Sequence, residues 1–318
     1  MSIATIANPI TPESLPPVRD YVAYKEGQFR MAMDLVKLDL AEWIEIDDQL
    51  PAELAERRRL LTEQHSEVFA SLSEGDEGSQ ETLALLVDHL TDYFPQLYQR
   101  DGSKLHNHAT GETWHLQQST LHPLELAGRL VQEDLCLMGR DDKTGLYRLT
   151  AACLCFPTRW LLAEKIGQTL GQIHAPVPTY DTTLESPMDR LFEKLRIHRP
   201  VARLNWSVVD DPTLFQPTGR GNPNAQGQLT ADNVGERLWM RMERQTLRRL
   251  PQSQDILFTI RIYVHPLADL ADKPERAAQL AGMLHSTNAH KIGPYKSLPA
   301  IFEATMGWLE RVAKNHAL

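Results

Sequence analysis

Residues 154–180 read LCFPTRWLLAEKIGQTLGQIHAPVPTY. The pattern predicts the end of a buried strand, a helix opened by proline, a glycine break and a second short helical turn. The stretch then places His174 in the peptide Ile-His-Ala-Pro-Val-Pro. Its two prolines restrict the backbone on the C-terminal side of the histidine and remove two N–H donors. A side chain on such a stiff peptide is held in one direction, so His174 is our central candidate for a site residue.

Outward from this stretch, apolar residues alternate with polar ones in several segments. Residues 135–138 and 146–156 predict two strands joined by the turn sequence GRDDKTG. Residues 201–209, 238–242 and 256–264 predict three more strands, each with every second residue on one face. Strands that cluster in the second half, with helices on either side, indicate an α+β fold with a mostly antiparallel sheet.

The remaining segments are predicted to be helices and loops. Residues 51–72 and 83–97 form helices separated by the polar break SEGDEGSQ, so the first hundred residues are mainly helical. Further helices are expected at 121–133, after the Ser186-Pro187 start, and at 298–312. Residues 30–38 are expected to be a short strand, 101–118 a loop, and 215–233 a long loop that acts as a lid or docking surface.

Domain organisation follows from these segments. Residues 1–20 are expected to be loosely ordered, which leaves 21–318 as a single domain. Its parts are mainly helical at 21–120, sheet at 121–270 and helical again at 271–318.

Bulk properties exclude several classes. The chain has 318 residues and a formal net charge of −9, which argues against nucleic acid or an anionic membrane as the main partner. No apolar run approaches the roughly 18 residues of a membrane span, and no signal peptide is evident. The three cysteines, Cys136, Cys153 and Cys155, fit a reducing cytoplasm rather than a disulfide framework. We therefore expect a cytoplasmic location.

Five blocks of the sequence, in the same order, resemble the bacterial heme-dependent oxidative N-demethylase family, alpha-subunit-like. They are LCFPTRW, IHAPVP, RLNWSVVDDPTLFQP, ERQTLRRLP and LFTIRIYVHPL. The resemblance runs from about residue 29 to about residue 308. It implies a PAS-like sheet that holds heme b in its concave face. It also implies a monooxygenase-type reaction in which O2 removes a methyl group from a small secondary amine such as dimethylamine, giving formaldehyde.

The same resemblance implies a separate reductase subunit that supplies electrons from NADPH through flavin and an iron–sulfur cluster. The chain has no ferredoxin-type cysteine run of its own. It also lacks the glycine-rich nucleotide-binding loops and the nucleophile elbow of hydrolases. The electrons would therefore come from a partner.

His174 is the candidate ligand to the heme iron, since a neutral imidazole is a common axial donor. The alternative is a core or turn histidine whose ring is satisfied by the backbone. His198 and His122 are reserve ligands. Cys153 and Cys155 are rival thiolate ligands, although small buried hydrophobes are the simpler interpretation. The cluster His106, His108 and His115 resembles a metal site, but a solvated polar loop explains it better.

Four arginines are candidates to bind the heme propionates, because a guanidinium suits a carboxylate. They are Arg244, Arg261, Arg203 and Arg159. Arg203 shares a strand face with Asn205 and Ser207, and the three strand rows could line a polar pocket mouth. The alternative is a sheet face directed to water. Glu243 and Asp210 are carboxylates available to a protonated amine, but ordinary ion pairing explains them better, and no substrate contact is assigned.

Two other functions remain open at this point. A PAS-like module could bind heme or a small ligand as a sensor without turnover, since a fold does not fix a function. A heme-free structural relative is the third possibility. NADPH-dependent release of formaldehyde separates the enzyme from the sensor, and a colourless protein would indicate the heme-free relative.

Overall fold

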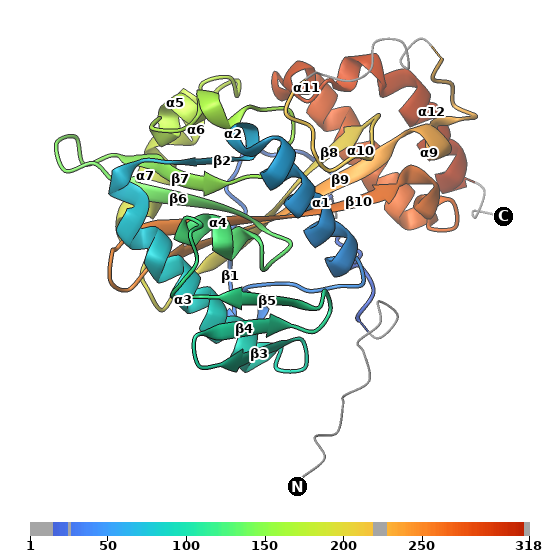
Figure 1. Cartoon of the computed structure of the whole chain (residues 1–318). Helices are drawn as coiled ribbons and strands as arrows, with labels where there is room; N and C mark the ends of the chain where they lie inside the picture. Colours follow the sequence, from blue (N-terminus) through green and yellow to red (C-terminus); the bar gives the residue numbers. More distant parts are fainter. Residues whose placement is uncertain (1–14, 25–26, 219–227, 315–318) are drawn as a thin grey trace, which may run out of the picture.

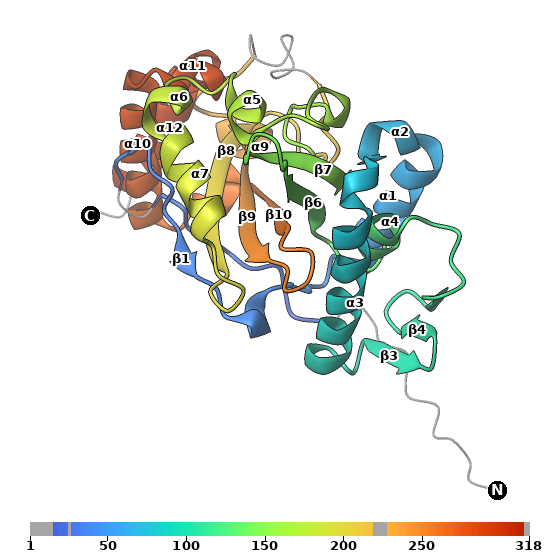
Figure 2. The ribbon, with the colours of Figure 1, turned by 90° about the vertical axis from the view of Figure 1, so that its left-hand side faces the viewer.

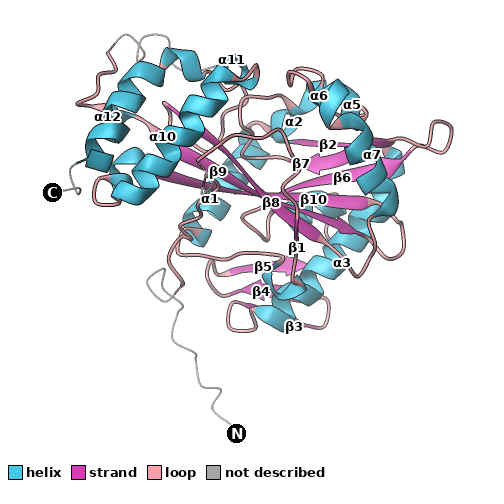
Figure 3. Ribbon diagram, turned by 180° about the vertical axis from the view of Figure 1, so that it is seen from behind, coloured by secondary structure: helices cyan, strands magenta, loops and turns pink. Residues whose placement is uncertain are grey.

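The computed structural model describes residues 15–24, 27–218 and 228–314 (Figure 1). Its centre is a seven-stranded sheet in the order β1-β8-β9-β10-β6-β7-β2, and all of its neighbouring strands pair antiparallel. Helices α1, α3 and α4 lie on one side of the strands and α5 to α7 on the other (Figure 2). Helices α10 to α12 pack together beside one end of the sheet (Figure 3). The predicted α+β fold with an antiparallel sheet is confirmed.

The three long strands follow the alternation seen in the sequence. They are β8 (Val201–Val209), β9 (Trp239–Arg249) and β10 (Ile256–Pro266). Because side chains alternate between the faces of a strand, register decides which rows meet. Arg203 pairs with Gln245, which pairs with Ile260, whereas Leu204 pairs with Arg244, which pairs with Arg261. The two rows lie on opposite faces of the sheet.

The predicted hairpin after residue 134 is also present, as β6 (Asp134–Arg140) and β7 (Tyr147–Cys153). Asp141 closes its turn by accepting hydrogen bonds from the N–H groups of Lys143 and Thr144, and Gly145 supplies the positive φ of 75°. Two short strands lie at the sheet edges, β1 (Val36–Lys37) and β2 (Phe69–Ser71). The strand expected over 30–38 is thus reduced to two residues.

The first hundred residues need two corrections. The helix expected over 51–72 divides into α1 (Leu50–Glu63) and α2 (His65–Val68), and β2 follows because its residues pair with β7. The expected polar break is a 3-10 turn, η3 (Ser73–Gly75), after which α3 (Asp76–Tyr93) already begins. A further 3-10 turn, η2 (Leu40–Glu42), is capped by Asp39, whose side chain accepts from the Ala41 N–H.

Residues 101–118 do not form the predicted loop. A separate three-stranded sheet contains β3 (Tyr98–Asp101), β4 (Lys104–Asn107) and β5 (Glu112–His115). Leu105 is fully buried beneath it and anchors the sheet to the core under α3. Tyr98 of β3 is buried in the same core and Trp114 of β5 packs against it, so each strand contributes one side chain that fixes the small sheet.

The segment between β7 and β8 carries the stretch that opened the sequence analysis. No helix starts at Pro157; the chain turns at Arg159, whose φ is 60°. The 3-10 turn η4 (Leu162–Glu164), α5 (Leu170–His174), α6 (Tyr180–Thr183) and α7 (Glu185–Lys194) follow. Thr169 and Gln172 form a reciprocal capping box at the start of α5. His174 is therefore the last residue of a capped helix.

The remaining helices differ from expectation at their ends. The predicted helix 121–133 is shorter, α4 (Pro123–Gly128), and His122 is its N-cap. The C-terminal helix is α12 (Phe302–Lys314), because Leu298 belongs to a separate 3-10 turn. Four elements were not expected: α9 (Val234–Arg237), η5 (Leu267–Leu270), α10 (Pro274–Ala289) and α11 (Ile292–Tyr295). The turn before α12 is η6 (Leu298–Ala300).

Two sequence expectations lie wholly or partly outside the described residues. These are the loosely ordered N-terminus, over residues 1–14, and the lid loop, over 219–227. Among the helices that the structure describes, none is long and apolar enough to cross a membrane.

Candidate functional site: a cavity against the sheet

A cavity of about 1100 Å³ lies against one face of the large sheet. The face is set by register: Arg203 and Asn205 on β8, Gln245 and Glu243 on β9, and the even-numbered residues of β10 point the same way. Helices α5 to α7 cover this face from outside (Figure 2), and the chain segment 28–38 borders it. The volume is slightly above the usual range for small-molecule and cofactor sites, roughly 300–1000 Å³.

The wall of the cavity over β10, β6 and β7 is apolar. Side chains from these strands and from the helices that cover them surround it, which suits a large apolar ligand. The apolar residues of this wall are Phe258, Ile260, Ile262, Cys136, Met138, Leu149, Leu154, Phe156, Leu170, Met188 and Phe192.

His174 lines the cavity from the C-terminal end of α5. Its Nδ1 lies 2.9 Å from the carbonyl oxygen of Leu170, one turn back in the same helix. The ring stacks on Tyr180, with centroids 4.5 Å apart and planes 13° from parallel. Burial lowers the pKa of His174, so the neutral imidazole is favoured.

These contacts define what the imidazole can do. A carbonyl oxygen can only accept, so Nδ1 carries the proton and Nε2 keeps its lone pair. A ring fixed in this tautomer by a backbone carbonyl is the usual arrangement of a histidine that ligates a metal. The helix, its capping box and the stacked tyrosine orient the side chain. The two prolines that follow His174 take no part in this hydrogen bond or in the ring stacking, although the sequence pattern drew attention to them.

Arg203 reaches the cavity from β8 and carries a buried, unsatisfied donor. Its Nε has no hydrogen-bond partner among the described residues. Burial lowers the pKa of its guanidinium, while the charges of Asp34 and Glu243 act in the opposite direction. A buried donor without an acceptor is unfavourable, and an anionic ligand in the cavity would satisfy it.

Arg159 also lines the cavity, but it already has a carboxylate partner. Its Nη2 lies 2.9 Å from Asp210 Oδ1. Its positive φ is shared by Asp34 and Ser297, which also line the cavity, and by Thr179, beside Tyr180. Non-glycine residues in the left-handed region cost free energy and collect at functional sites. The cavity is therefore bordered by strained backbone.

Arg244 and Arg261 lie in a row on the other face of the sheet. Arg261 pairs with Asp47 at 2.7 Å and with Glu53 at 2.6 Å, and it is not among the cavity residues. Arg244 borders the cavity, but its Nε lies 3.2 Å from Glu45 Oε1 and it donates to backbone carbonyls near residue 43. The structure thus brings Arg203 and Arg159 to His174's cavity and occupies the other two guanidinium groups elsewhere.

The reserve and rival ligands are also separated from the cavity. His198 is exposed, and His122 caps α4 while its Nε2 lies near Ser71 and Asp76. Cys153 and Cys155 are fully buried, and the pKa of the Cys155 thiol is raised by its contact with Cys153 and by burial. Neither cysteine lines the cavity.

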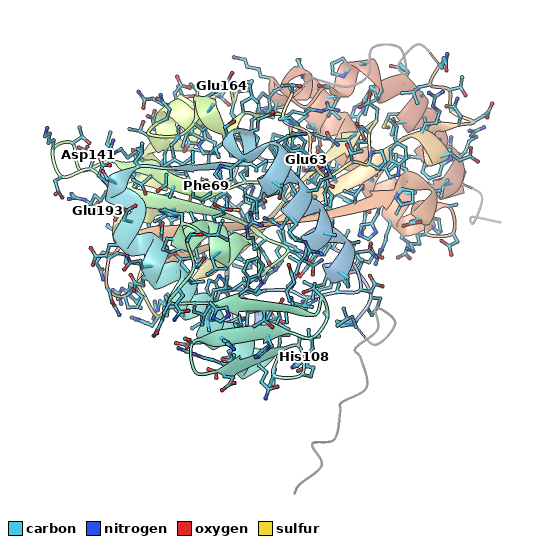
Figure 4. All side chains as sticks on the ribbon, in the orientation of Figure 1. Glu63, Phe69, His108, Asp141, Glu164 and Glu193 are labelled. Carbon is cyan, nitrogen blue, oxygen red and sulfur yellow. The ribbon has the colours of Figure 1, made fainter. Side chains whose placement is uncertain are left out.

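His106 and His115 lie on strands β4 and β5 of the small sheet, and His108, labelled in Figure 4, lies in the turn between these strands. His106 Nδ1 lies 2.8 Å from the hydroxyl of Thr113. Within the residues that the structure describes, no three His, Cys, Asp or Glu side chains are grouped to hold a metal ion. Glu164, also labelled in Figure 4, borders the cavity beside α5, at the opposite end of the molecule.

Two cavity residues were missed or left unassigned. Lys296 was not considered, since nothing around it in the sequence distinguishes it from a surface lysine. Glu243 was considered without assignment, and the structure holds its carboxylate with three neutral donors. These are Thr158 Oγ1 at 2.6 Å, Gln245 Nε2 at 2.8 Å and Asn205 Nδ2 at 3.1 Å. Within β9, alternation does place Glu243 beside Gln245 on one face, which was the available signal.

Together these features define an α+β protein with a large apolar cavity against its sheet, bordered by a neutral imidazole and cationic side chains. The family model "Haem-dependent oxidative N-demethylase, alpha subunit-like" matches residues 34–306. The chain belongs to this family. The family description implies heme, an oxidative N-demethylase-like function and a partner subunit.

The residues present fit heme. An imidazole with a free Nε2 suits the iron, the apolar wall suits the macrocycle, and the unsatisfied Arg203 donor suits a propionate. His174 and Arg203 are close enough for the charge of Arg203 to lower the pKa of His174. The donor set is thus gathered in one place.

Proposed function

We propose that this protein is the heme-b-binding subunit of an oxidative N-demethylase that acts on a small secondary amine such as dimethylamine, with His174 as the iron ligand. The observation that carries the proposal is the neutral imidazole at the wall of the 1100 Å³ cavity, with Nδ1–H donated to Leu170 and Nε2 without a hydrogen bond from the described residues. Membership of the family supplies the reaction class. Arg203, near the start of β8, binds one propionate, whereas Arg159 borders the cavity beyond the other end of β8, where it pairs with Asp210.

The proposed sheet is PAS-like. Strand order and connections support this assignment: β6 to β10 are arranged β7-β6-β10-β9-β8. Numbered along the chain, that order is 2-1-5-4-3. The helical segment α5–α7 connects the second strand to the third across one face, where the cavity lies.

Bound heme supplies the oxygen chemistry, in which a secondary amine, O2, NADPH and a proton give a primary amine, formaldehyde, NADP⁺ and water. One oxygen atom ends in formaldehyde and the other in water, so the reaction is that of a monooxygenase. The electrons come from a separate reductase subunit that carries flavin and an iron–sulfur cluster. The protein orients the reactants and excludes water.

Glu243 is the carboxylate proposed to meet the substrate. A secondary amine arrives as an ammonium ion, which needs an acceptor of opposite charge. Glu243 faces the cavity, and its three neutral donors hold it in place without neutralising it. Asp210, the other candidate, is already paired with Arg159. Glu243 therefore provides a negative charge that faces the cavity beside the apolar wall.

The test is spectroscopic first. Protein expressed with added iron and heme precursor is expected to show a Soret band, and His174→Ala is expected to weaken or shift it. His198→Ala, at an exposed position, is the control that leaves it unchanged. With a reductase and NADPH, dimethylamine is expected to yield formaldehyde. An identical heme content and spectrum in His174→Ala would overturn the ligand assignment, and bound heme without turnover would favour the sensor.

A further inference from the structure

Two cationic side chains from different parts of the chain meet at the cavity. Arg203 comes from β8, whereas Lys296 follows α11 in the C-terminal helical unit. Lys296 Nζ donates to the carbonyl oxygen of Trp206, lies 3.5 Å from Asn205 Oδ1 and stands 4.9 Å from the centre of the Trp206 ring. Its positive charge is therefore held by neutral groups.

The carboxylates around this pair do not neutralise it, although the charges of Asp34 and Glu243 both act on Arg203. Glu243 influences the pKa of both cations, but its hydrogen bonds come from Thr158, Asn205 and Gln245. Within the described part of the chain, neither Arg203 nor Lys296 is within salt-bridge distance of a carboxylate. Two like charges thus face one cavity without direct counter-ions.

The electrostatic consequence appears in both groups. Burial lowers the pKa of Lys296 to about 8, and the charge of Arg203 contributes to the lowering. Burial likewise lowers the pKa of Arg203. A cation that is desolvated and close to another cation is relieved by an anion, and charge-assisted hydrogen bonds to carboxylates are the strongest that such donors form.

We infer that Arg203 and Lys296 form a two-point receptor for the two carboxylates of the porphyrin. This inference rests on the proposed heme site and adds a second, lysine anchor to it. The apolar wall fits the body of such a ligand, and the two cations match its two charges. Because Lys296 belongs to the C-terminal helical unit, that unit completes the cofactor site.

A pH dependence follows from the geometry. The groups that face Lys296 are Arg203 and Asn205 on β8 and Glu243 on β9. A bound carboxylate raises the pKa of Lys296, so above pH 8 binding takes up a proton. The affinity then falls by up to about tenfold per pH unit until the pKa of the bound state is reached. His174, whose pKa is lowered, is already neutral in this range.

The experiment compares iron-free protoporphyrin IX with its dimethyl ester, which has the same body but no carboxylate charge. Absence of iron removes the contribution of His174. The unliganded protein and two variants are titrated by porphyrin fluorescence at pH 7 and pH 9. Lys296→Met removes the proposed anchor. Lys37→Met is the matched control, because it removes an exposed lysine that borders the same cavity.

The unmodified protein is expected to prefer the diacid, and Lys296→Met to lose that preference by about tenfold or more together with the weakening above pH 8. Lys37→Met should keep both. Equal preference and pH dependence in Lys296→Met and the unmodified protein would overturn the inference while leaving the heme site intact. Absence of a Soret band in protein expressed with added iron and heme precursor would instead overturn the proposed function.

A second measurement uses only the unmodified protein, so it does not depend on folding of the variants. Acetylation by acetic anhydride is followed by mass spectrometry with and without protoporphyrin IX. The porphyrin is expected to protect Lys296 and to leave the labelling of Lys291, which is exposed on the neighbouring turn, unchanged. Labelling of Lys296 at the same rate in both samples would contradict its role.

Discussion

Both faces of the large sheet carry buried or partly buried cations, but these cations differ in whether carboxylates pair with them. On the α1 face, Arg261 lies 2.7 Å from Asp47 and 2.6 Å from Glu53. These side chains are almost completely buried. On the cavity face, Arg203 and Lys296 are partly buried and have no such partners among the described residues.

The difference separates structural charges from binding charges. A buried ion pair removes water from both partners and replaces it with a complete set of protein contacts, so it needs nothing further. A desolvated cation without a carboxylate is a cost that folding does not recover by itself. Such a cost persists at binding sites, where a ligand supplies the missing charge. Both its shape and its cations without carboxylate partners therefore indicate that the cavity face binds a ligand.

Removing one arginine from each face should have unequal effects on the free energy of unfolding. Arg261→Met leaves Asp47 and Glu53 buried without their partner, and a destabilisation of about 3–5 kcal/mol is expected. Arg203→Met removes an unsatisfied donor, so the ligand-free protein should change by less than about 1 kcal/mol. Urea unfolding of the ligand-free proteins measures both. Equal losses from the two substitutions would contradict the distinction.

The contrast also shows what the sequence could predict. Alternation located β8 with the correct ends and placed Arg203, Asn205 and Ser207 on one face, because that pattern is a local property of the strand. Alternation does not tell which face of the sheet a row joins. Arg244 and Arg261 were grouped with Arg203 for that reason, and the register separates them. Register depends on pairing between strands, which is not a local property.

Other features were beyond local patterns for similar reasons. Phe69 to Ser71 continue a helix-forming run, but their pairing with β7 makes them a strand. Lys296 reaches Asn205 across 91 positions of the sequence, and no spacing rule connects them. His174 was found because its peptide is unusual. Its tautomer is set by the carbonyl of Leu170 one helical turn earlier, and this contact depends on the fold of α5 and not on the residue pattern.

Glu133 is the least satisfied group of the α1 face, and it should make stability depend on pH. Burial raises the pKa of Glu133 from 4.5 to about 7, and its Oε2 has no hydrogen-bond partner in the described structure. The folded state therefore keeps a proton that the unfolded state loses between pH 4.5 and 7. Stability is full below that window and falls as pH rises through it, by roughly 2 kcal/mol.

Glu133→Gln should remove this decline while keeping an oxygen acceptor for the Glu45 N–H. Urea unfolding at pH 5 and pH 7 gives the loss of unfolding free energy for each protein, and the two losses are compared. The difference is the useful quantity because Asp255, whose pKa burial raises to about 7, contributes a decline to both. A decline of the same size in Glu133→Gln would show that Glu133 is already ionised and paired. All the charged groups of the α1 face would then have partners.

The smallest expected effect concerns thiol reactivity on the two faces. Cys136 borders the cavity, whereas Cys153 lies against Gly128 of α4 on the other face, where an added Cβ on the glycine would come within 2.3 Å of its sulfur. Burial raises the pKa of Cys136, so its reaction is slow, but a small reagent can reach it through the cavity. N-ethylmaleimide followed by mass spectrometry should label Cys136 first, and Cys153 only on unfolding. Protoporphyrin should slow the first reaction alone. Faster labelling of Cys153 would mean that the α1 face opens more readily than the cavity face, and the electrostatic contrast would then not reflect access to the site.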